Sequence, residues 1–119
     1  MNEWPTDIVF SGDEVGGNFN TGSLLSSRTP AGNPVRRAYE LFLGPKDVGR
    51  ASWDLTAAYF AVHGSDGVFT TSVPGTVTID ANGGNVFTPG SSGRHRYLKK
   101  VKTNAEITTL LDDLLIQTP

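Results

Sequence analysis

Residues 52–62 read SWDLTAAYFAV, and this stretch predicts the helix on which the interpretation of the whole chain depends. Leu55, Ala58, Tyr59 and Val62 recur at the spacing of one face of an α-helix. Because an apolar stripe of this kind is stable when other elements cover it, we expect the helix to lie on the core.

The first turn of this helix carries a candidate cation ligand. Ser52 is placed to cap the helix, and Asp54 follows within the first turn, where the helix dipole favours a carboxylate. A carboxylate that points outward from this position can bind a hard cation. The simpler interpretation is an Asp that only complements the dipole, because acidic first turns are common. Spacing alone leaves both interpretations open.

Composition is typical of a small single-domain protein. The 119 residues suffice for one domain, residues 1–119, with a single modest core. The net charge of −2 gives no field toward nucleic acid or an anionic membrane, so neither is expected as a partner. The absence of Cys excludes disulfides, thiolate metal sites and a thiol nucleophile. No apolar run approaches the ~20 residues of a membrane span, and Met1–Pro5 does not resemble a signal peptide. We therefore expect a cytoplasmic protein.

A strand followed by a loop of ligand-binding type is predicted near the start of the chain. Asp7–Gly12 is a short apolar run typical of a buried strand in a parallel sheet. Asp13–Gly17 follows at the carboxyl end of this strand, where open α/β sheets place ligand loops, and Glu14 is its candidate substrate-binding residue. A flexible acidic turn is the alternative interpretation. Asn18–Gly32 is predicted to be a polar loop with room for one helical turn.

Another helix is expected between this loop and the helix that contains Asp54. Asn33 is its predicted cap, Pro34 its first residue, and Gly44-Pro45 its end. The predicted buried stripe consists of Val35, Ala38, Tyr39 and Phe42. The following helix should end at His63-Gly64, where the helix dipole favours a His.

Beyond residue 68 the pattern changes to the two-residue period of strands. The Asn82-Gly83 pair favours a tight hairpin turn. The basic run after Gly93 is interpreted as an edge strand protected by Lys, with a phosphate or RNA patch as the alternative. The expected strands are Val68–Thr71, Thr76–Asp80, Asn85–Thr88 and Arg94–Lys102.

The chain is predicted to end in an amphipathic helix. Thr103 and Glu106 have the spacing of a capping box. The apolar stripe that follows consists of Ile107, Leu110, Leu111 and Leu114, and Asp112 and Asp113 are expected in solvent. Taken together, these elements predict a mixed α/β fold with a short first strand, two amphipathic helices, a β-hairpin, a third strand and a terminal helix.

Four segments resemble, in order and rough spacing, one branch of the inosine–uridine-preferring nucleoside hydrolases. The resemblance extends over about Trp4 to Pro119, and it implies the C-terminal third of that fold. The four segments are WPTDIVFSGDEVG at 4–16, similar to WPTPIVFSGFEVG in that branch, Asn33-Pro34 with Ala38-Tyr39, SWDLTA at 52–57, and GRHRYL at 93–98.

The resemblance implies a calcium-dependent N-glycosidase that cleaves the bond between ribose and a nucleobase. Asp54 matches the family's Asp that binds Ca²⁺, and a hard cation is suited to carboxylate oxygens. Trp53 stands where many members carry a His that helps the base to leave. Because an indole cannot donate a titratable proton, Trp53 is expected to stack on a base instead. Trp53 and Glu14 are therefore the candidate substrate-binding residues, and Asp54 is the candidate metal ligand.

The chain lacks the family's Asp-rich loop, which supplies most Ca²⁺ ligands and the base, and its ribose-binding Asn/Glu/Asn segment. One carboxylate cannot supply the six to eight oxygens that Ca²⁺ takes. We therefore expect a nucleoside hydrolase-like fragment that is inactive alone, with calcium binding weak or absent, and assign no catalytic residue. The alternative is a stand-alone ligand-binding or protein-interaction module. A nucleoside or ribose ligand is expected, together with a homo-oligomer or a complementing chain, because the strand around Ile8–Phe10 would lose its neighbours.

Overall fold

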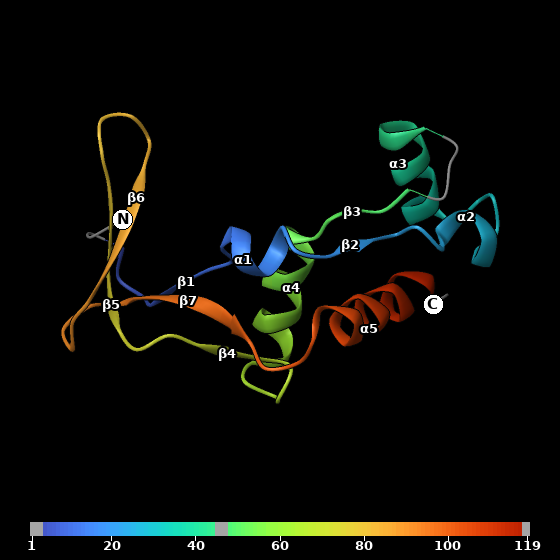
Figure 1. Ribbon diagram of the computed structural model, residues 1–119. Helices are drawn as coiled ribbons and strands as arrows, with labels where there is room; N and C mark the ends of the chain where they lie inside the picture. The colour runs from blue at the N-terminus through green and yellow to red at the C-terminus, as the bar shows by residue number, and fades with distance from the viewer. Residues whose placement is uncertain (1–3, 45–47, 118–119) are drawn as a thin grey trace.

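The computed structural model describes residues 4–44 and 48–117, which form the expected mixed α/β fold (Figure 1). The described residues contain a five-stranded sheet, a separate two-stranded sheet and five helices. In chain order the elements are β1 (Ile8–Phe10), α1 (Asp13–Gly16), β2 (Asn20–Thr21), α2 (Leu25–Arg28), α3 (Pro34–Leu43), β3 (Arg50–Ala51), α4 (Trp53–His63), β4 (Phe69–Thr71), β5 (Gly75–Ile79), β6 (Asn85–Pro89), β7 (His95–Lys100) and α5 (Asn104–Ile116).

Strand β7 lies at the centre of the main sheet. On one side β1 pairs with it in parallel, with Ile8 opposite His95. On the other side β4 pairs with it antiparallel along Leu98 to Lys100, and β5 joins it through one bridge, from Gly75 to His95. The prediction of an edge strand protected by Lys is therefore wrong, because the backbone of this strand has partners on both sides.

Strand β1 confirms the predicted parallel pairing, but it is not a buried strand. Ile8 and Phe10 are half-buried, and the side chain of Val9 is 37% exposed. In the part of the chain that the structure describes, β7 is the only strand that pairs with β1. The other edge of β1 is therefore open.

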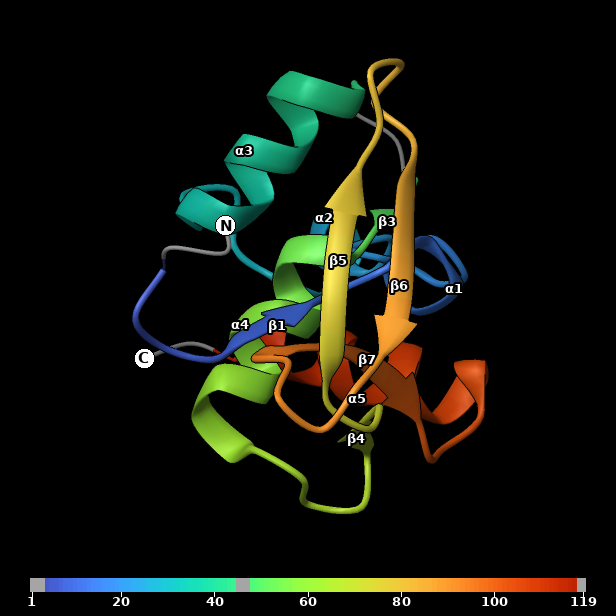
Figure 2. The same cartoon turned by 90° about the vertical axis from the view of Figure 1, so that its left-hand side faces the viewer.

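The predicted hairpin is confirmed, and it stands as an arm at one end of the molecule (Figure 1), which Figure 2 shows from the arm's side. We call β5, β6 and their connection the β5–β6 arm. Its turn is closed by the backbone N–H of Gly83, which donates to the carbonyl of Asp80 at 3.1 Å. Gly83 has φ = 85°, a left-handed conformation that explains the Asn-Gly pair at this position.

Two contacts attach the base of the β5–β6 arm to β7. The imidazole of His95 is buried, and its Nδ1 accepts a hydrogen bond of 2.8 Å from the backbone N–H of Val77. The rings of Phe87 and Tyr97 meet edge to face, with their centroids 4.9 Å apart. The free end of the arm is more exposed, since the side chain of Ile79 is 60% exposed.

The hydrophobic core lies where α1, α4 and α5 cover the sheet. Helix α4 confirms the predicted helix, but its buried face differs from the predicted stripe. Thr56 is fully buried and bonds to Ser11, with 2.6 Å between their hydroxyl oxygens, whereas Val62 is 79% exposed and Ala58 is exposed. The ring of Tyr59 contacts Phe69 of β4, which turns this side of α4 toward the sheet. The buried apolar residues of the core are Val15, Phe19, Val68, Phe69, Leu98, Ile107 and Leu111.

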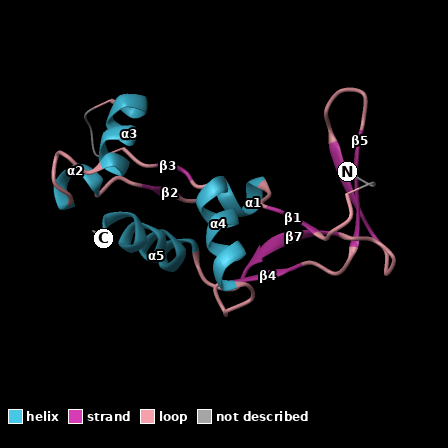
Figure 3. Cartoon of the chain, turned by 180° about the vertical axis from the view of Figure 1, so that it is seen from behind, coloured by secondary structure: helices cyan, strands magenta, loops and turns pink. Residues whose placement is uncertain are grey.

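Helix α3 begins and ends as predicted, but its expected buried stripe is wrong. The side chain of Asn33 accepts the backbone N–H of Arg36 at 3.0 Å, and Gly44 ends the helix with φ = 88°. Phe42 is nevertheless 68% exposed, and Ala38 is also exposed. The reason is that α3 lies at the far end of the molecule beside α2 and receives little cover (Figure 3). Pro45, which we expected to help end this helix, lies outside the described residues.

Helix α5 confirms the predicted capping box. Thr103 Oγ1 accepts the backbone N–H of Glu106 at 3.3 Å, and Glu106 Oε2 accepts the backbone N–H of Thr103 at 2.9 Å. Asp113 is exposed as expected, but the expectation for Asp112 is wrong. Asp112 is buried, and its Oδ1 accepts the backbone N–H of Gly22 at 2.6 Å, because β2 runs beside α5.

The expected polar loop at residues 18–32 contains the strand β2 and one helical turn, α2. The sequence had allowed for one such turn in this loop. The acidic loop after β1 is itself the short helix α1. Among the helices in residues 4–44 and 48–117, none has the length and apolar character needed to cross a membrane.

Candidate functional site

The start of α4 is held against α1, and this contact fixes the position of Asp54. The backbone N–H of Ser52 donates to the carbonyl of Gly16 at 2.8 Å. A Cβ on Gly16 would clash with Trp53, so only a glycine allows the two helices to come this close. Asp54 is the second residue of α4, and it is exposed.

Ser52 does not cap α4 with its side chain, which corrects the prediction. Its hydroxyl lies 2.7 Å from the hydroxyl of Thr21 and also donates to the carbonyl of Arg50 at 3.1 Å. Ser52 and Thr21 are both buried. The hydroxyl therefore ties β2 to the segment that enters α4, and it positions that segment instead of the first helical turn.

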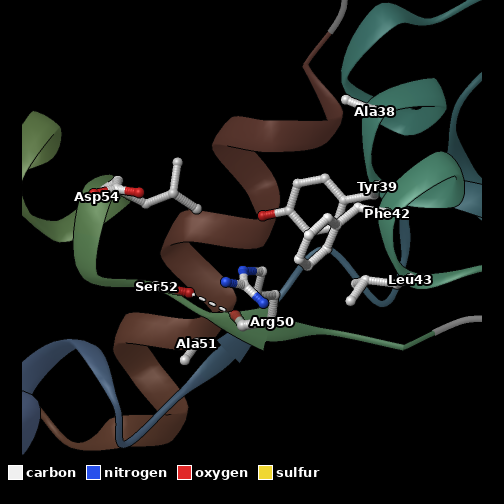
Figure 4. A pocket seen from close by; sticks show the side chains of 9 residues that line it. Ala38, Tyr39, Phe42, Leu43, Arg50, Ala51, Ser52 and Asp54 are labelled. Carbon is white, nitrogen blue, oxygen red and sulfur yellow. Dashed lines mark hydrogen bonds between the residues drawn. The ribbon is translucent and has the colours of Figure 1, made fainter.

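A pocket of about 340 Å³ opens in front of Asp54 (Figure 4). Helix α3 contributes Tyr39, Phe42 and Leu43, and β3 contributes Arg50. In the view of Figure 4, Asp54 lies on one side and the two aromatic rings on the other. The pocket thus combines a flat apolar wall with polar groups at its rim, a composition typical of small-molecule sites.

Two opposite charges line this pocket. The guanidinium carbon of Arg50 lies 4.5 Å from the centroid of the Phe42 ring. Among the described residues, neither the Arg50 guanidinium nor the Asp54 carboxylate has a hydrogen-bond or ion-pair partner. Within the part of the chain that the structure describes, both groups are therefore unpaired.

The described residues do not fit a calcium ion on their own. Within residues 4–44 and 48–117, no three His, Cys, Asp or Glu side chains gather in a way that could hold a metal. Asp54 supplies at most two oxygens, whereas Ca²⁺ takes six to eight. The guanidinium of Arg50 lines the same pocket and repels a cation. Calcium binding at Asp54 therefore stays a prediction that requires further ligands.

The other two predicted site residues lie near Asp54 but do not line its pocket. Trp53 is 38% exposed and lies against Gly16 of α1. Glu14 is exposed and lines a second cavity of about 840 Å³, which β1, α1 and the β5–β6 arm enclose. The contact between α1 and α4 thus places Trp53 against α1, whereas Glu14 and Asp54 line different cavities.

Sequence reasoning missed Arg50, Tyr39 and Phe42 as pocket residues. Tyr39 and Phe42 were expected in a buried stripe, and no role was assigned to Arg50. One signal was present in the sequence, since Arg50 precedes Asp54 by four residues. Because a strand-to-helix junction lies between them, this spacing does not produce the ion pair that it would favour within a helix.

The strongest electrostatic coupling on α4 lies at its other end. The hydroxyl of Tyr59 donates to Asp66 Oδ2 at 2.6 Å. This hydrogen bond raises the pKa of Tyr59 to about 12 and lowers the pKa of Asp66. Asp66 also accepts the backbone N–H of Val68, so the pair fixes the loop after α4 and has no part in the pocket.

Comparisons with models of known protein families, with curated proteins and with solved structures found no match for this chain. The resemblance to nucleoside hydrolases therefore stays a prediction from four sequence segments.

Proposed function

We propose that this chain is a nucleoside hydrolase-like module that binds a nucleoside in the pocket at Asp54 and does not cleave it unaided. The observation that carries the proposal is the exposed carboxylate of Asp54, which lines a pocket of about 340 Å³ on the side opposite the aromatic rings of Tyr39 and Phe42. A pocket of this volume lies within the range of roughly 300–1,000 Å³ that small-molecule sites occupy.

The chemistry of the pocket suits the two parts of a nucleoside. A carboxylate is an acceptor with two oxygens, and it can accept hydrogen bonds from the two neighbouring hydroxyls of a ribose. Charged acceptors form hydrogen bonds roughly twice as strong as neutral ones, so Asp54 would contribute strongly to orientation. The planar base has an apolar face, which the rings of Tyr39 and Phe42 can cover.

Cleavage of the glycosidic bond needs groups that the pocket does not provide among the described residues. Activating a water molecule requires a general base or a metal ion, and among the described residues that line this pocket Asp54 is the only one with an acidic side chain. A calcium ion would require several further oxygen ligands from another polypeptide segment, with Asp54 as one ligand. Binding without cleavage is therefore the activity proposed for the isolated chain.

The first prediction is that inosine binds to the full chain. Asp54→Asn should weaken this binding roughly tenfold or more, because the amide side chain offers one acceptor oxygen and no charge. Isothermal titration calorimetry measures the binding, with and without Ca²⁺. The matched control is Asp113→Asn, which removes the same charge from an exposed position on α5 and should bind inosine like the wild type. Circular dichroism verifies that both variants are folded.

Two results would contradict the proposal. The first is inosine binding that Asp54→Asn leaves unchanged, or no inosine binding at all. The second is release of hypoxanthine from inosine by the isolated chain with added Ca²⁺, lost in Asp54→Ala, because it would make the chain a complete hydrolase.

A protein-interaction module is the second candidate function, and the exposed apolar side chains of the β5–β6 arm favour it. Ile79 is 60% exposed although it belongs to a β-strand, and it lies on the same face of the arm as Val77 and Phe87, which line the second cavity with it. Apolar surface of this kind marks interaction sites when it is contiguous. This candidate is compatible with the first one, because the arm lies at the opposite end of the molecule from α3, which forms the aromatic wall of the pocket at Asp54 (Figure 1).

A further inference from the structure

We infer that the pocket at Asp54 selects a nucleoside that carries a phosphate group, and that Arg50 binds this phosphate. This inference rests on the proposed nucleoside site and names its substrate class, a nucleoside 5′-monophosphate. The guanidinium of Arg50 lines the same pocket as Asp54 and has no ionic partner among the described residues. A site for a neutral nucleoside does not need such a cation.

The position of Arg50 is fixed by its backbone and by its ring contact. Arg50 pairs with Thr21 in the two-stranded sheet, and its carbonyl accepts the hydroxyl of the buried Ser52 at 3.1 Å. At the other end of the side chain, the guanidinium lies over the Phe42 ring at 4.5 Å. A side chain held at both ends loses less conformational freedom when a ligand binds.

The stacked arrangement leaves the binding groups of Arg50 available. A guanidinium that lies over an aromatic ring uses its face for the contact, whereas its N–H donors lie in its plane. These donors match a phosphate in a two-pronged geometry, and such charge-assisted pairs are stronger than neutral hydrogen bonds. The arrangement over Phe42 therefore prepares Arg50 for an oxyanion at the rim of the pocket.

A neutral ligand would fill this pocket less favourably than an anion. Closing a ligand over Arg50 removes water from the guanidinium, and a neutral molecule does not compensate for this loss. The carboxylate of Asp54 repels an anion in its own vicinity, so the phosphate should lie at Arg50 and the hydroxyls at Asp54. A nucleoside 5′-monophosphate has both groups, with the ribose hydroxyls on the opposite edge of the sugar from the phosphate.

The test is calorimetric titration of the full chain with inosine, inosine 5′-monophosphate, ribose 5-phosphate and inorganic phosphate at one ionic strength. The monophosphate should bind roughly tenfold or more tightly than inosine, because it adds a charge-assisted pair. It should also bind more tightly than either phosphate that lacks the base, because Tyr39 and Phe42 then have no ring to contact. Arg50→Gln should reduce the ratio of the two affinities, monophosphate over inosine, to about twofold or less. A difference of that size is no larger than the effect of one neutral hydrogen bond.

Two further variants separate a phosphate site from a general charge effect. Arg50→Lys keeps the charge but loses the planar donors, so it should retain only part of the advantage. Arg28→Gln is the matched control, because it removes the same charge from an exposed position on α2 outside the pocket, and it should bind both ligands like the wild type. If Arg50→Gln does not fold by circular dichroism, Arg50→Lys and Arg28→Gln still decide the question.

The outcomes distinguish this inference from the proposed function. Equal binding of inosine and its monophosphate would overturn the phosphate site and leave the nucleoside site standing. An advantage of the monophosphate that survives in both Arg50 variants would also overturn the role of Arg50. Tight binding of inorganic phosphate alone, at the level of the monophosphate, would contradict both the base contact and the nucleoside site.

Discussion

At the scale of single residues, Asp112 and Asp113 show how two identical neighbours on one helix acquire different roles. Asp113 is exposed, whereas Asp112 is buried and accepts the backbone N–H of Gly22 at 2.6 Å. Gly22 has φ = 92°, and a Cβ there would clash with the ring of Tyr39. The carboxylate of Asp112 thus satisfies a buried backbone donor in the tight turn that leads from β2 to α2.

We predict that Asp112→Ala lowers the free energy of unfolding by about 1–3 kcal/mol, because it leaves the N–H of Gly22 buried without an acceptor. Asp112→Asn should cost less, since the amide oxygen can still accept this hydrogen bond. Asp113→Ala is the matched control and should change stability by no more than about 0.5 kcal/mol. Urea unfolding followed by circular dichroism gives the three values. Equal effects at the two positions would show that the contact to Gly22 contributes nothing.

Residue roles that follow from local rules could be predicted, and roles that depend on distant contacts could not. The cap at Asn33 and the left-handed Gly44 follow from the few residues around them, and both are confirmed. In contrast, Asp112 depends on Gly22, which lies 90 residues away in the sequence. The same reason explains why Arg50 was missed, because its contact with Phe42 forms only after α3 and β3 come together.

At the scale of secondary-structure elements, helix α5 depends on an ionised capping box. Glu106 accepts from the hydroxyl and the backbone N–H of Thr103, with oxygen–oxygen and nitrogen–oxygen distances of 2.7 and 2.9 Å. These hydrogen bonds, together with nearby Lys102, lower the pKa of Glu106 from 4.5 to about 2. A folded-state pKa below the unfolded value means that the ionised form is favoured by folding.

We predict that this contribution to stability is complete above about pH 4.5 and is lost as the pH falls toward about 2. The free energy of unfolding of the wild type should therefore exceed that of Glu106→Gln at neutral pH, and the difference should shrink as the pH falls through this window. Thr103→Ala should lower stability by about 0.5–2 kcal/mol at neutral pH, as expected for the loss of a helix cap. Urea midpoints measured from pH 7 to pH 2 test both statements. A gap between wild type and Glu106→Gln that does not change with pH would contradict the role of the ionised carboxylate.

The longer elements could be predicted from the sequence, but not the short α1, β2 and β3, nor the faces that the helices bury. Caps, turns and periodicity are local signals, and they gave the hairpin, the parallel first strand and the three long helices. The buried face of a helix depends on its neighbours. Helix α3 has a clear apolar stripe, yet it lies at the end of the molecule, and Phe42 and Leu41 remain 68% and 70% exposed. This incorrect assignment is also why the aromatic wall of the candidate site was not predicted.

At the scale of the whole molecule, the chain is more extended than a compact domain of its length. Its radius of gyration is 16.4 Å, against about 13.5 Å expected for 119 residues. Its accessible surface is 7447 Å², against about 6,200 Å² for a compact monomer of this mass. The excess of roughly 1,200 Å² is larger than the ~800 Å² that each partner contributes to a standard protein interface.

The location of this exposed surface indicates where a partner would bind. The cavity between α1 and the β5–β6 arm has a large apolar and aromatic part, and the charged Asp13, Glu14 and Lys99 also line it. Its apolar and aromatic part includes Phe10, Val77, Ile79, Phe87 and Tyr97. A hairpin that no third strand covers along most of its length is marginally stable in water, and open strand edges favour pairing with another chain. Strands β5 and β6 contain no charged residue that would oppose such pairing.

We predict that the chain forms a symmetric homodimer at micromolar concentration through this face of the β5–β6 arm, since a twofold dimer is the commonest way to cover such a surface. Burying several hundred Å² of apolar surface at about 25 cal/mol per Å² contributes on the order of 10 kcal/mol before the costs of association. Light scattering across a dilution series measures the mass. Ile79→Lys places a charge on this face and should shift the chain to the monomer, whereas Thr78→Lys, its neighbour on the opposite face of β5, should leave the dimer intact. A monomer at every concentration, or equal effects of the two variants, would show that this face does not mediate self-association.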